Sequence, residues 1–238
     1  LETWDSPGPI RVLDAACGKA YLSLALYLWA ELRKNPIELV GIDREPAIVE
    51  SVERSARRLE YARASFLAGP IRDYAASRAE PVDLLVSLHA CDTATDEALA
   101  AGVSLGASAI VLAPCCHQEL HTQIQAGRQA HSLPAETTWA ATLGSGLLRH
   151  RLADIVTDSL RAAALEALGY QVDVIEFVSP EATARNLMIR AEKRQPGPST
   201  RDSAARAFDR YRTLAAEWAV RPALEDLLGD AWPPRSMA

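Results

Sequence analysis

In Ile10-Arg11-Val12-Leu13-Asp14-Ala15-Ala16-Cys17-Gly18-Lys19-Ala20, an apolar strand runs directly into a loop of small residues. From Tyr21 onward, apolar residues recur at helical spacing, so this loop joins a strand to a helix. In a doubly wound fold such a loop lies at the carboxyl edge of a parallel sheet, where nucleotides bind. The stretch therefore predicts an α/β fold with a nucleotide-type site at residues 14–20.

Strand and helix patterns alternate along most of the remaining chain. Helices are expected after Pro46, where Glu and Arg pairs fall four residues apart, around 96–101 and over 152–168, ending at Gly169. Strands that alternate with helices predict a mostly parallel sheet covered on both faces. Further strands are predicted at 37–43, 65–67, 82–88, 109–113, 172–178 and 187–189.

Two segments depart from this alternation. Residues 118–151 are polar, contain three of the five histidines and show no strand pattern, which favours a lid or substrate loop. Residues 195–200 have the composition of a linker, and apolar residues at 208, 211, 215 and 218 then share one helix face. We expect a main domain at 1–194 and a docked helical extension at 195–238. The extension is too short for a robust core of its own.

Composition sets broad limits on location and partners. The 238-residue chain is 49% hydrophobic, and no apolar run reaches a membrane span. Four cysteines are too few for a secreted disulfide framework, so we expect a soluble, cytoplasmic protein with reduced thiols and no membrane partner. A net charge of −6 disfavours nonspecific coating of nucleic acid. Leu1 is not an initiator methionine, and an upstream segment of the same protein is a candidate to complete the substrate site.

The loop matches the D-x-G-x-G-x-G pattern of class I S-adenosylmethionine (SAM)-dependent methyltransferases only in part. Asp14 and Gly18 match, whereas Ala16 and Ala20 replace two glycines. Glycine allows positive φ and a close approach to the ligand, and an alanine in such a conformation costs about 1 kcal/mol or more. Judged alone, the loop is also compatible with an ordinary tight turn.

An acidic residue strengthens the nucleotide interpretation. Asp43 ends the second strand, 25 residues after Gly18, where a carboxylate can accept both ribose hydroxyl protons. A nicotinamide-binding fold shares this geometry but normally shows G-x-G-x-x-G. Class I methyltransferases often have an apolar residue and an acid around the adenine after the third strand, and here Ile71 is the candidate to pack on the base and Asp73 is the candidate acid. The expected cofactor contacts are Asp14, Ala16, Cys17, Gly18, Lys19, Ala20, Asp43, Arg44, Ile71, Ser87 and His89.

Two further segments, Ser87-Leu88-His89-Ala90-Cys91-Asp92-Thr93 and Ala113-Pro114-Cys115-Cys116-His117, follow the fourth and fifth strands. With the first loop they resemble a methyltransferase family that includes the methyltransferase-like 25 proteins and the methyltransferase portion of the glutathione S-transferase C-terminal-domain-containing protein. That family looks related to tRNA acceptor-stem 2′-O-methyltransferases. The resemblance spans about residues 10–192, although relatives commonly carry glycine where this chain has Asp92.

The resemblance implies a Rossmann-like class I methyltransferase with a seven-stranded sheet. The implied strand order is 3-2-1-4-5-7-6, with the last strand antiparallel to its neighbour. The implied cofactor is SAM. Residues that contact the methyl acceptor follow the fourth strand in such enzymes, which makes His89 the first catalytic candidate, with Asp92 and His117 as further ones. A base is needed only if the acceptor carries a proton that must leave, and His89 is alternatively a scaffold residue.

The cysteines and a basic run have alternative interpretations. A zinc site at Cys115 and Cys116 is disfavoured because consecutive strand residues point to opposite faces and no C-x-x-C pair exists, so we expect no metal. Cys17 is expected as a buried, apolar side chain. Arg149-His150-Arg151 is a candidate for a phosphate contact, but a solvated charge run is the favoured explanation.

The leading functional prediction is transfer of the SAM methyl group to an unidentified acceptor. RNA is favoured over protein or a small molecule, because of the tRNA-modifying relatives. A SAM-binding module that has lost catalysis is one alternative, since two loop glycines are absent. A nicotinamide oxidoreductase is the other, and the glycine spacing disfavours it.

Overall fold

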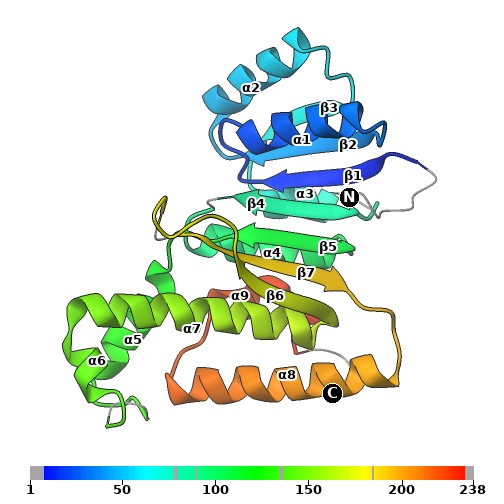
Figure 1. The fold of residues 1–238 in the computed structure, drawn as a ribbon. Helices are drawn as coiled ribbons and strands as arrows, with labels where there is room; N and C mark the ends of the chain where they lie inside the picture. The colour runs from blue at the N-terminus through cyan, green and yellow to red at the C-terminus, as the bar shows by residue number, and fades with distance from the viewer. Residues whose placement is uncertain (1–7, 78–79, 89, 135–136, 184, 234–238) are drawn as a thin grey trace.

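A computed structural model describes residues 8–77, 80–88, 90–134, 137–183 and 185–233. Seven strands form one sheet in the order β3-β2-β1-β4-β5-β7-β6 (Figure 1). Only β7 runs antiparallel, and it pairs with both β5 and β6. The strand order predicted from the sequence is confirmed. The strands are β1 (Ile10–Ala15), β2 (Ile37–Asp43), β3 (Ala64–Ala68), β4 (Leu84–Leu88), β5 (Ala109–Ala113), β6 (Tyr170–Glu176) and β7 (Leu187–Lys193).

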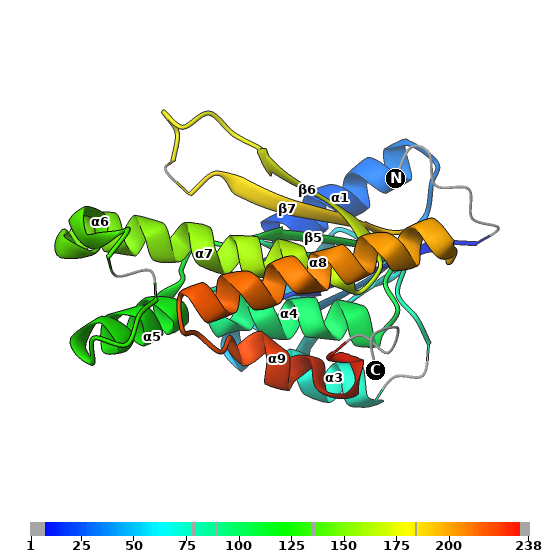
Figure 2. The same cartoon turned by 90° about the horizontal axis from the view of Figure 1, so that it is seen from below.

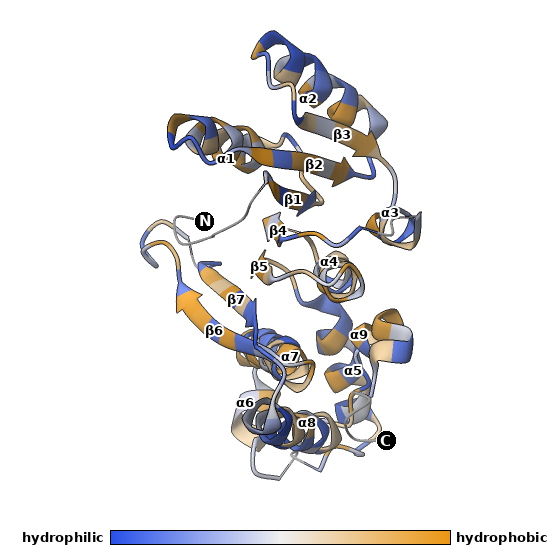
Figure 3. Cartoon of the chain, turned by 90° about the vertical axis from the view of Figure 1, so that its right-hand side faces the viewer, coloured by the Kyte–Doolittle hydropathy of each residue, from blue (hydrophilic) through white to orange (hydrophobic). Residues whose placement is uncertain are grey.

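Helices cover both faces of the sheet. Viewed along the strands, α1 lies on one side and α3 and α4 lie on the other, and apolar residues concentrate on the strands (Figure 3). One core cluster joins α1 and α2 to the first face, and a larger one joins α4, α5, α7, α8 and α9 to the second. The helices are α1 (Tyr21–Leu32), α2 (Pro46–Arg58), α3 (Ile71–Ser77), α4 (Thr93–Ser104), α5 (Gln118–Gln129), α6 (Ala140–Gly144), α7 (Gly146–Ala167), α8 (Pro198–Glu217), α9 (Ala223–Leu228) and the 3-10 turn Gly229–Ala231.

Most of the segment 118–151 is helical, so the loop conformation expected for it was wrong, and its role as a lid or substrate region stays a prediction. It forms α5, α6 and the first turns of α7. In α5, Leu120 and Ile124 are buried one helical turn apart against α7. Two buried apolar residues in a helix of twelve leave a weak periodic signal, which is why the sequence did not reveal this helix.

The C-terminal helices pack on the sheet domain. α8 begins at Pro198, inside the segment predicted as a linker, with proline at a first-turn position that suits it. α8 lies along α7, and α9 lies beside α4 (Figures 1 and 2). Tyr211, Trp218 and Leu224 are buried in the same core cluster as the sheet residues. Within the described residues, no helix is both long and apolar enough to cross a membrane.

Candidate active site at the carboxyl edge of the sheet

The loop between β1 and α1 holds three residues in the left-handed conformation. The φ angles of Ala16, Gly18 and Ala20 are 61°, 52° and 54°. The loop is fixed to the sheet by the Cys17 amide, which donates to the Ile42 carbonyl at 2.9 Å. The two alanines that replace glycines of the methyltransferase pattern therefore keep the glycine conformation, at a cost of about 1 kcal/mol each.

We expect Ala16→Gly to raise the free energy of unfolding by roughly 0.5–1 kcal/mol, because relief of the left-handed strain outweighs the added entropy of the unfolded chain. Ala20 has the same conformation but is buried. Ala20→Gly also loses a buried methyl group, worth about 0.8 kcal/mol, so its net effect should lie near zero or below. Chemical denaturation of both variants measures the difference. Equal losses of unfolding free energy in the two would show that Ala16 is not strained.

Asp14, at the end of β1, has an unsatisfied carboxylate oxygen. The side chain is 2% exposed, and Ser23 donates a hydrogen bond to Oδ2. Among the described residues, Oδ1 has no hydrogen-bond partner. Burial, with a smaller contribution from the charge of Asp43, raises the pKa of Asp14 to about 7, against the lowering effect of Ser23. Buried acceptors in native proteins normally have a hydrogen-bond partner, so this oxygen is a candidate contact for a bound ligand.

Asp43, at the end of β2, holds the loop with both carboxylate oxygens. Oδ2 accepts from the Gly18 amide at 2.9 Å, and Oδ1 accepts from the Glu45 amide at 3.0 Å. An ionised carboxylate has about four acceptor positions, so each oxygen retains one for a ligand hydroxyl. Asp43 thus shapes the loop in addition to the ribose contact predicted for it.

A cavity of about 130 Å³ opens beside these residues. It is smaller than the roughly 300–1,000 Å³ of most ligand pockets and accommodates only part of a nucleoside. Ile71 and Arg44 both line it, as does Glu97 from α4, which the sequence analysis missed. Arg44 Nη2 donates to both carboxylate oxygens of Glu97 at 2.6 Å, across 53 residues of sequence. The lining residues are Ala15, Ala16, Ile42, Asp43, Arg44, Gly69, Ile71, Ala94 and Glu97.

Other predicted cofactor residues have different surroundings. The Ser87 hydroxyl is buried and donates to the Ala15 carbonyl at 2.7 Å, which ties β4 to the end of β1. Cys17 Sγ and the Phe66 ring occupy the space over Gly41. Lys19 is exposed, and His89 lies outside the described residues. Asp73 is exposed beside Arg72 and does not line the cavity.

His117 is buried between two carboxylates of α7. Nε2 lies 2.9 Å from Asp158 Oδ1, and Nδ1 lies 3.1 Å from Asp154 Oδ1, an ion-pair distance without hydrogen-bond geometry. Burial disfavours a charged ring, but the two carboxylates outweigh it and raise the pKa of His117. Arg185 forms an ion pair with Asp154 from the other side. The two carboxylates therefore favour the protonated ring of His117 more than water would.

Arg161 extends this buried network. Its guanidinium donates to both oxygens of Asp96, at 2.8 and 2.9 Å, and to Asp158 Oδ1 at 3.2 Å. A fourth bond, at 2.9 Å, goes to the Asp92 carbonyl. Asp154, Asp158 and Arg161 lie one helical turn apart on α7 and form a charged stripe. This stripe was not predicted, because only the apolar positions of that helix were used to locate it in the sequence.

Asp92 adopts a conformation that favours glycine. Its φ is 54° and its ψ is −123°, at the start of α4. Its Oδ1 accepts from the Glu119 amide at 2.9 Å, in the first turn of α5. The side chain thus connects the segment after β4 with the helix after β5, which a glycine cannot do.

Three cysteine sulfurs meet where β4 and β5 end. Sγ–Sγ distances are 3.7 Å for Cys91–Cys115, 3.7 Å for Cys115–Cys116 and 3.8 Å for Cys116–Cys91. β5 ends at Ala113, so the alternation of strand side chains does not apply to Cys115 and Cys116, and that argument against their convergence was wrong. Burial, with the neighbouring thiols, raises the pKa of Cys115 to about 12.

A second cavity at this edge, of about 230 Å³, lies over the His117 network. Arg151 and Arg185 line it together with Ile155 and Leu187. In the basic run Arg149-His150-Arg151, Arg149 donates to the Leu143 carbonyl at 2.6 Å, and His150 stacks on His121 with 3.5 Å between the ring centroids. Within the run, only Arg151 reaches this cavity.

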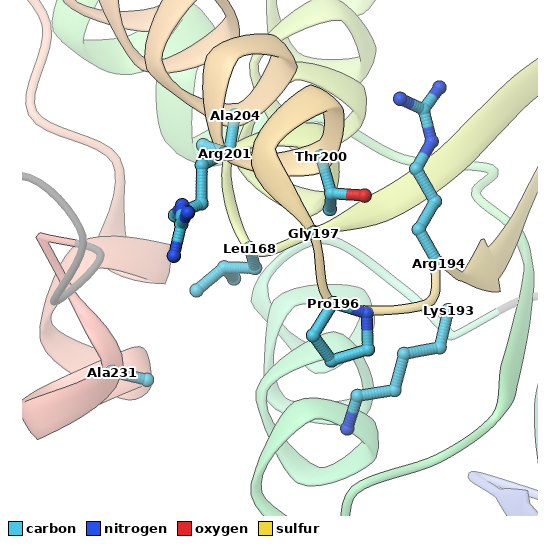
Figure 4. A pocket seen from close by; sticks show the side chains of 11 residues that line it. Leu168, Lys193, Arg194, Pro196, Gly197, Thr200, Arg201, Ala204 and Ala231 are labelled. Atoms are coloured by element: carbon cyan, nitrogen blue, oxygen red, sulfur yellow. The ribbon is translucent and has the colours of Figure 1, made fainter.

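A third cavity, of about 340 Å³, lies at the opposite edge of the sheet, between the end of β7 and the start of α8 (Figure 4). Lys193 sits there because β7 is antiparallel to β5 and ends where β5 begins. Figure 4 shows Lys193, Arg194 and Arg201 pointing in different directions. Ligands of doubly wound sheets bind at the carboxyl edge, so the first two cavities define the candidate site.

Residues 1–123, more than half of the chain, match the sequence model of a methyltransferase-domain family. The chain belongs to this family. A comparison with curated proteins gave no match. Fold and family together identify the chain as a class I methyltransferase domain, with the β1–α1 loop, Asp14 and Asp43 at the edge where such domains bind their cofactor.

The fold is similar to that of one solved structure, and two further solved structures match less well. A putative rRNA methylase from Clostridium thermocellum is 14% identical, with a TM-score of 0.51, over 79% of this chain and 88% of that one. The Podospora anserina methyltransferase PaMTH1, solved with SAH bound, is 14% identical, with a TM-score of 0.43, over 79% of this chain and 73% of that one. WbdD is 23% identical, with a TM-score of 0.38, over 47% of this chain, which spans only 26% of the WbdD chain.

Proposed function

We propose that this methyltransferase uses SAM as its methyl donor. The unsatisfied Oδ1 of Asp14 is the observation that carries the proposal. This oxygen lies at the carboxyl edge of the sheet, and the chain belongs to a methyltransferase-domain family. Among the groups that SAM offers, the ammonium of its methionine part suits a buried carboxylate best.

The residues at this edge fit the rest of the cofactor. Asp43 has acceptor positions for the ribose hydroxyls, and Ile71 with Gly69 forms an apolar wall for the adenine. A side chain at Gly18 would meet no protein atom within 4 Å, so the loop presents open backbone to a ligand. When bound, SAM supplies an electrophilic methyl group on its sulfonium. The alanines keep the left-handed loop conformation, which argues against a degenerate cofactor loop.

We infer that the acceptor side works mainly by positioning. Both ring nitrogens of His117 face the carboxylates of Asp154 and Asp158, and Asp92 accepts from the Glu119 amide, so we assign neither side chain as the base. Methyl transfer is an in-line displacement, so alignment of the acceptor supplies much of the rate. His117 and Asp92 are thus proposed as positioning residues, and His89 stays a catalytic prediction.

Asp14→Asn should stabilise the cofactor-free protein and weaken SAM binding. Because the folded pKa of Asp14 is about 7 and its unfolded value is 3.8, its contribution to stability is complete below pH 3.8 and is lost as pH rises through 7. The gain in unfolding free energy from Asp14→Asn should therefore be larger at pH 8 than at pH 5, by roughly 2–3 kcal/mol.

Denaturation at the two pH values, without cofactor, measures this difference. Glu50→Gln on the exposed face of α2 is the matched control and should show none. A gain for Asp14→Asn that does not change with pH, or unchanged SAM affinity, would contradict the role given to Asp14.

We propose RNA as the acceptor class. The resemblance to tRNA-modifying relatives supports it, and Arg151 and Arg185 provide cationic groups for a phosphate at the 230 Å³ cavity. Methyl-labelled SAM, incubated with the protein and size-fractionated cell extract, tests the acceptor. Label in nuclease-sensitive material is expected, and label only in protein or small molecules would overturn the RNA proposal. A protein inactivated by Asp43→Ala serves as the background.

A further inference from the structure

The three cysteine sulfurs at the ends of β4 and β5 form a nearly equilateral triangle. Cys91 lies in the segment between β4 and α4, and Cys115 and Cys116 lie in the segment between β5 and α5. Their sulfurs are 3.7, 3.7 and 3.8 Å apart, and none of the three cysteines is in a disulfide. Cys91 is exposed and the other two are half-buried, so the triangle is accessible from solvent.

We propose that Cys91, Cys115 and Cys116 bind a thiophilic divalent metal ion, zinc. Tetrahedral zinc binds thiolates at about 2.3 Å, which separates any two of its sulfur ligands by about 3.8 Å. The triangle has these dimensions, so three ligands are already in place. A disulfide requires sulfurs about 2.05 Å apart, and none of the three pairs approaches that distance.

The segments that carry the cysteines are fastened to each other and to the domain. Asp92, next to Cys91, accepts from the Glu119 amide, and its carbonyl accepts from buried Arg161. The Thr95 hydroxyl donates to the Ala90 carbonyl at 2.7 Å on the other side of Cys91. Metal sites depend on such outer contacts to orient their ligands. The strained backbone of Asp92 is thereby explained, because its side chain holds the two segments in register.

Among the described residues, the group comprises these three ligands. The fourth ligand of a tetrahedral zinc ion is then a solvent molecule, a group of the methyl acceptor or a residue outside the described part of the chain. Soft thiolate ligands select zinc or cobalt over magnesium or calcium. The proposal does not depend on SAM binding, since the metal can be measured without cofactor.

The test uses untagged protein, purified under reducing conditions and stripped of metal. We expect one zinc per chain by elemental analysis after reloading, and a thiolate-to-cobalt charge-transfer band after cobalt addition. Cys91→Ser, at the exposed corner, removes a metal ligand. It should weaken zinc binding by more than the roughly 10- to 100-fold that is lost when a residue that only hydrogen-bonds to a ligand is replaced. Cys17→Ala, which alters the remaining cysteine away from the triangle, should retain stoichiometric zinc.

Circular dichroism establishes that each variant is folded before its metal affinity is compared. Substoichiometric zinc and no cobalt–thiolate band in the folded wild-type protein would overturn the proposal. Wild-type zinc affinity in folded Cys91→Ser would overturn it as well. Because neither measurement uses SAM, failure of the metal proposal is distinguishable from failure of the proposed methyl transfer.

Discussion

Arg161→Met should lower the free energy of unfolding by about 3–5 kcal/mol, the largest stability loss that we predict. Arg161 is 1% exposed and donates hydrogen bonds to Asp96, Asp158 and the Asp92 carbonyl. Removing it leaves the buried Asp96 carboxylate without its cation and leaves Asp158 with only His117 as a partner. A buried charge that has lost its partner is far more costly than the absence of both members of the pair. Chemical denaturation near pH 7 measures the loss.

Arg54→Met is the matched control, because Arg54 makes an exposed ion pair with Glu50 at 2.8 Å on α2. Exposed pairs of this type contribute about 0.3–0.5 kcal/mol. Arg161→Lys keeps the charge but not the paired donation to Asp96, so it should fall between the two variants. Equal losses for Arg161→Met and Arg54→Met would show that the buried network does not stabilise the fold as described.

Asp43→Ala should weaken SAM binding by about 100-fold. The variant loses carboxylate contacts to the ribose and the two bonds that hold Gly18 and Glu45 in place. Hydrogen bonds to a charged group are worth about 1.5–3 kcal/mol each, and 1.4 kcal/mol corresponds to a tenfold change in affinity. Isothermal titration calorimetry of folded wild-type and variant protein gives the ratio directly.

A ligand analogue separates the ribose role of Asp43 from its loop role. S-adenosylhomocysteine and its 2′-deoxy form should differ in affinity for the wild-type protein and differ much less for Asp43→Ala. Glu50→Ala removes the same charge from an exposed site on α2 and should leave both affinities unchanged. If Asp43→Ala still discriminates against the deoxy form as the wild type does, the ribose assignment is wrong.

Local patterns predicted most of the fold. Apolar runs bounded by loops located the strands, and the pairs Glu50–Arg54 and Glu53–Arg57 form on α2 as expected from their spacing. Short-range regularity of this kind survives folding because helix and strand periods are properties of the backbone. The interpretation of 118–151 failed because α5 is stabilised by tertiary contacts, including the Asp92 carboxylate at its first turn, that leave little trace in local sequence.

The candidate site was predictable to a smaller extent. Asp14, Asp43 and Ile71 lie at the expected edge because strand ends are easily located. Glu97 pairs with Arg44 from 53 residues away, and the cysteines converge across 24 residues. Contacts of this kind depend on how the segments beyond the strand ends bend, and no periodic pattern encodes that geometry. The left-handed alanines were similarly visible only as substitutions in a motif.

Calorimetric titration of the intact, folded protein with SAM, S-adenosylhomocysteine and NADH tests the cofactor proposal most directly. We predict one binding site for SAM and S-adenosylhomocysteine, weakened in Asp14→Asn and Asp43→Ala, and no binding of NADH. The unsatisfied carboxylate of Asp14 and the loop held by Asp43 are the structural grounds for this result. Binding of NADH, or no binding of either adenosyl ligand to folded protein, would contradict it.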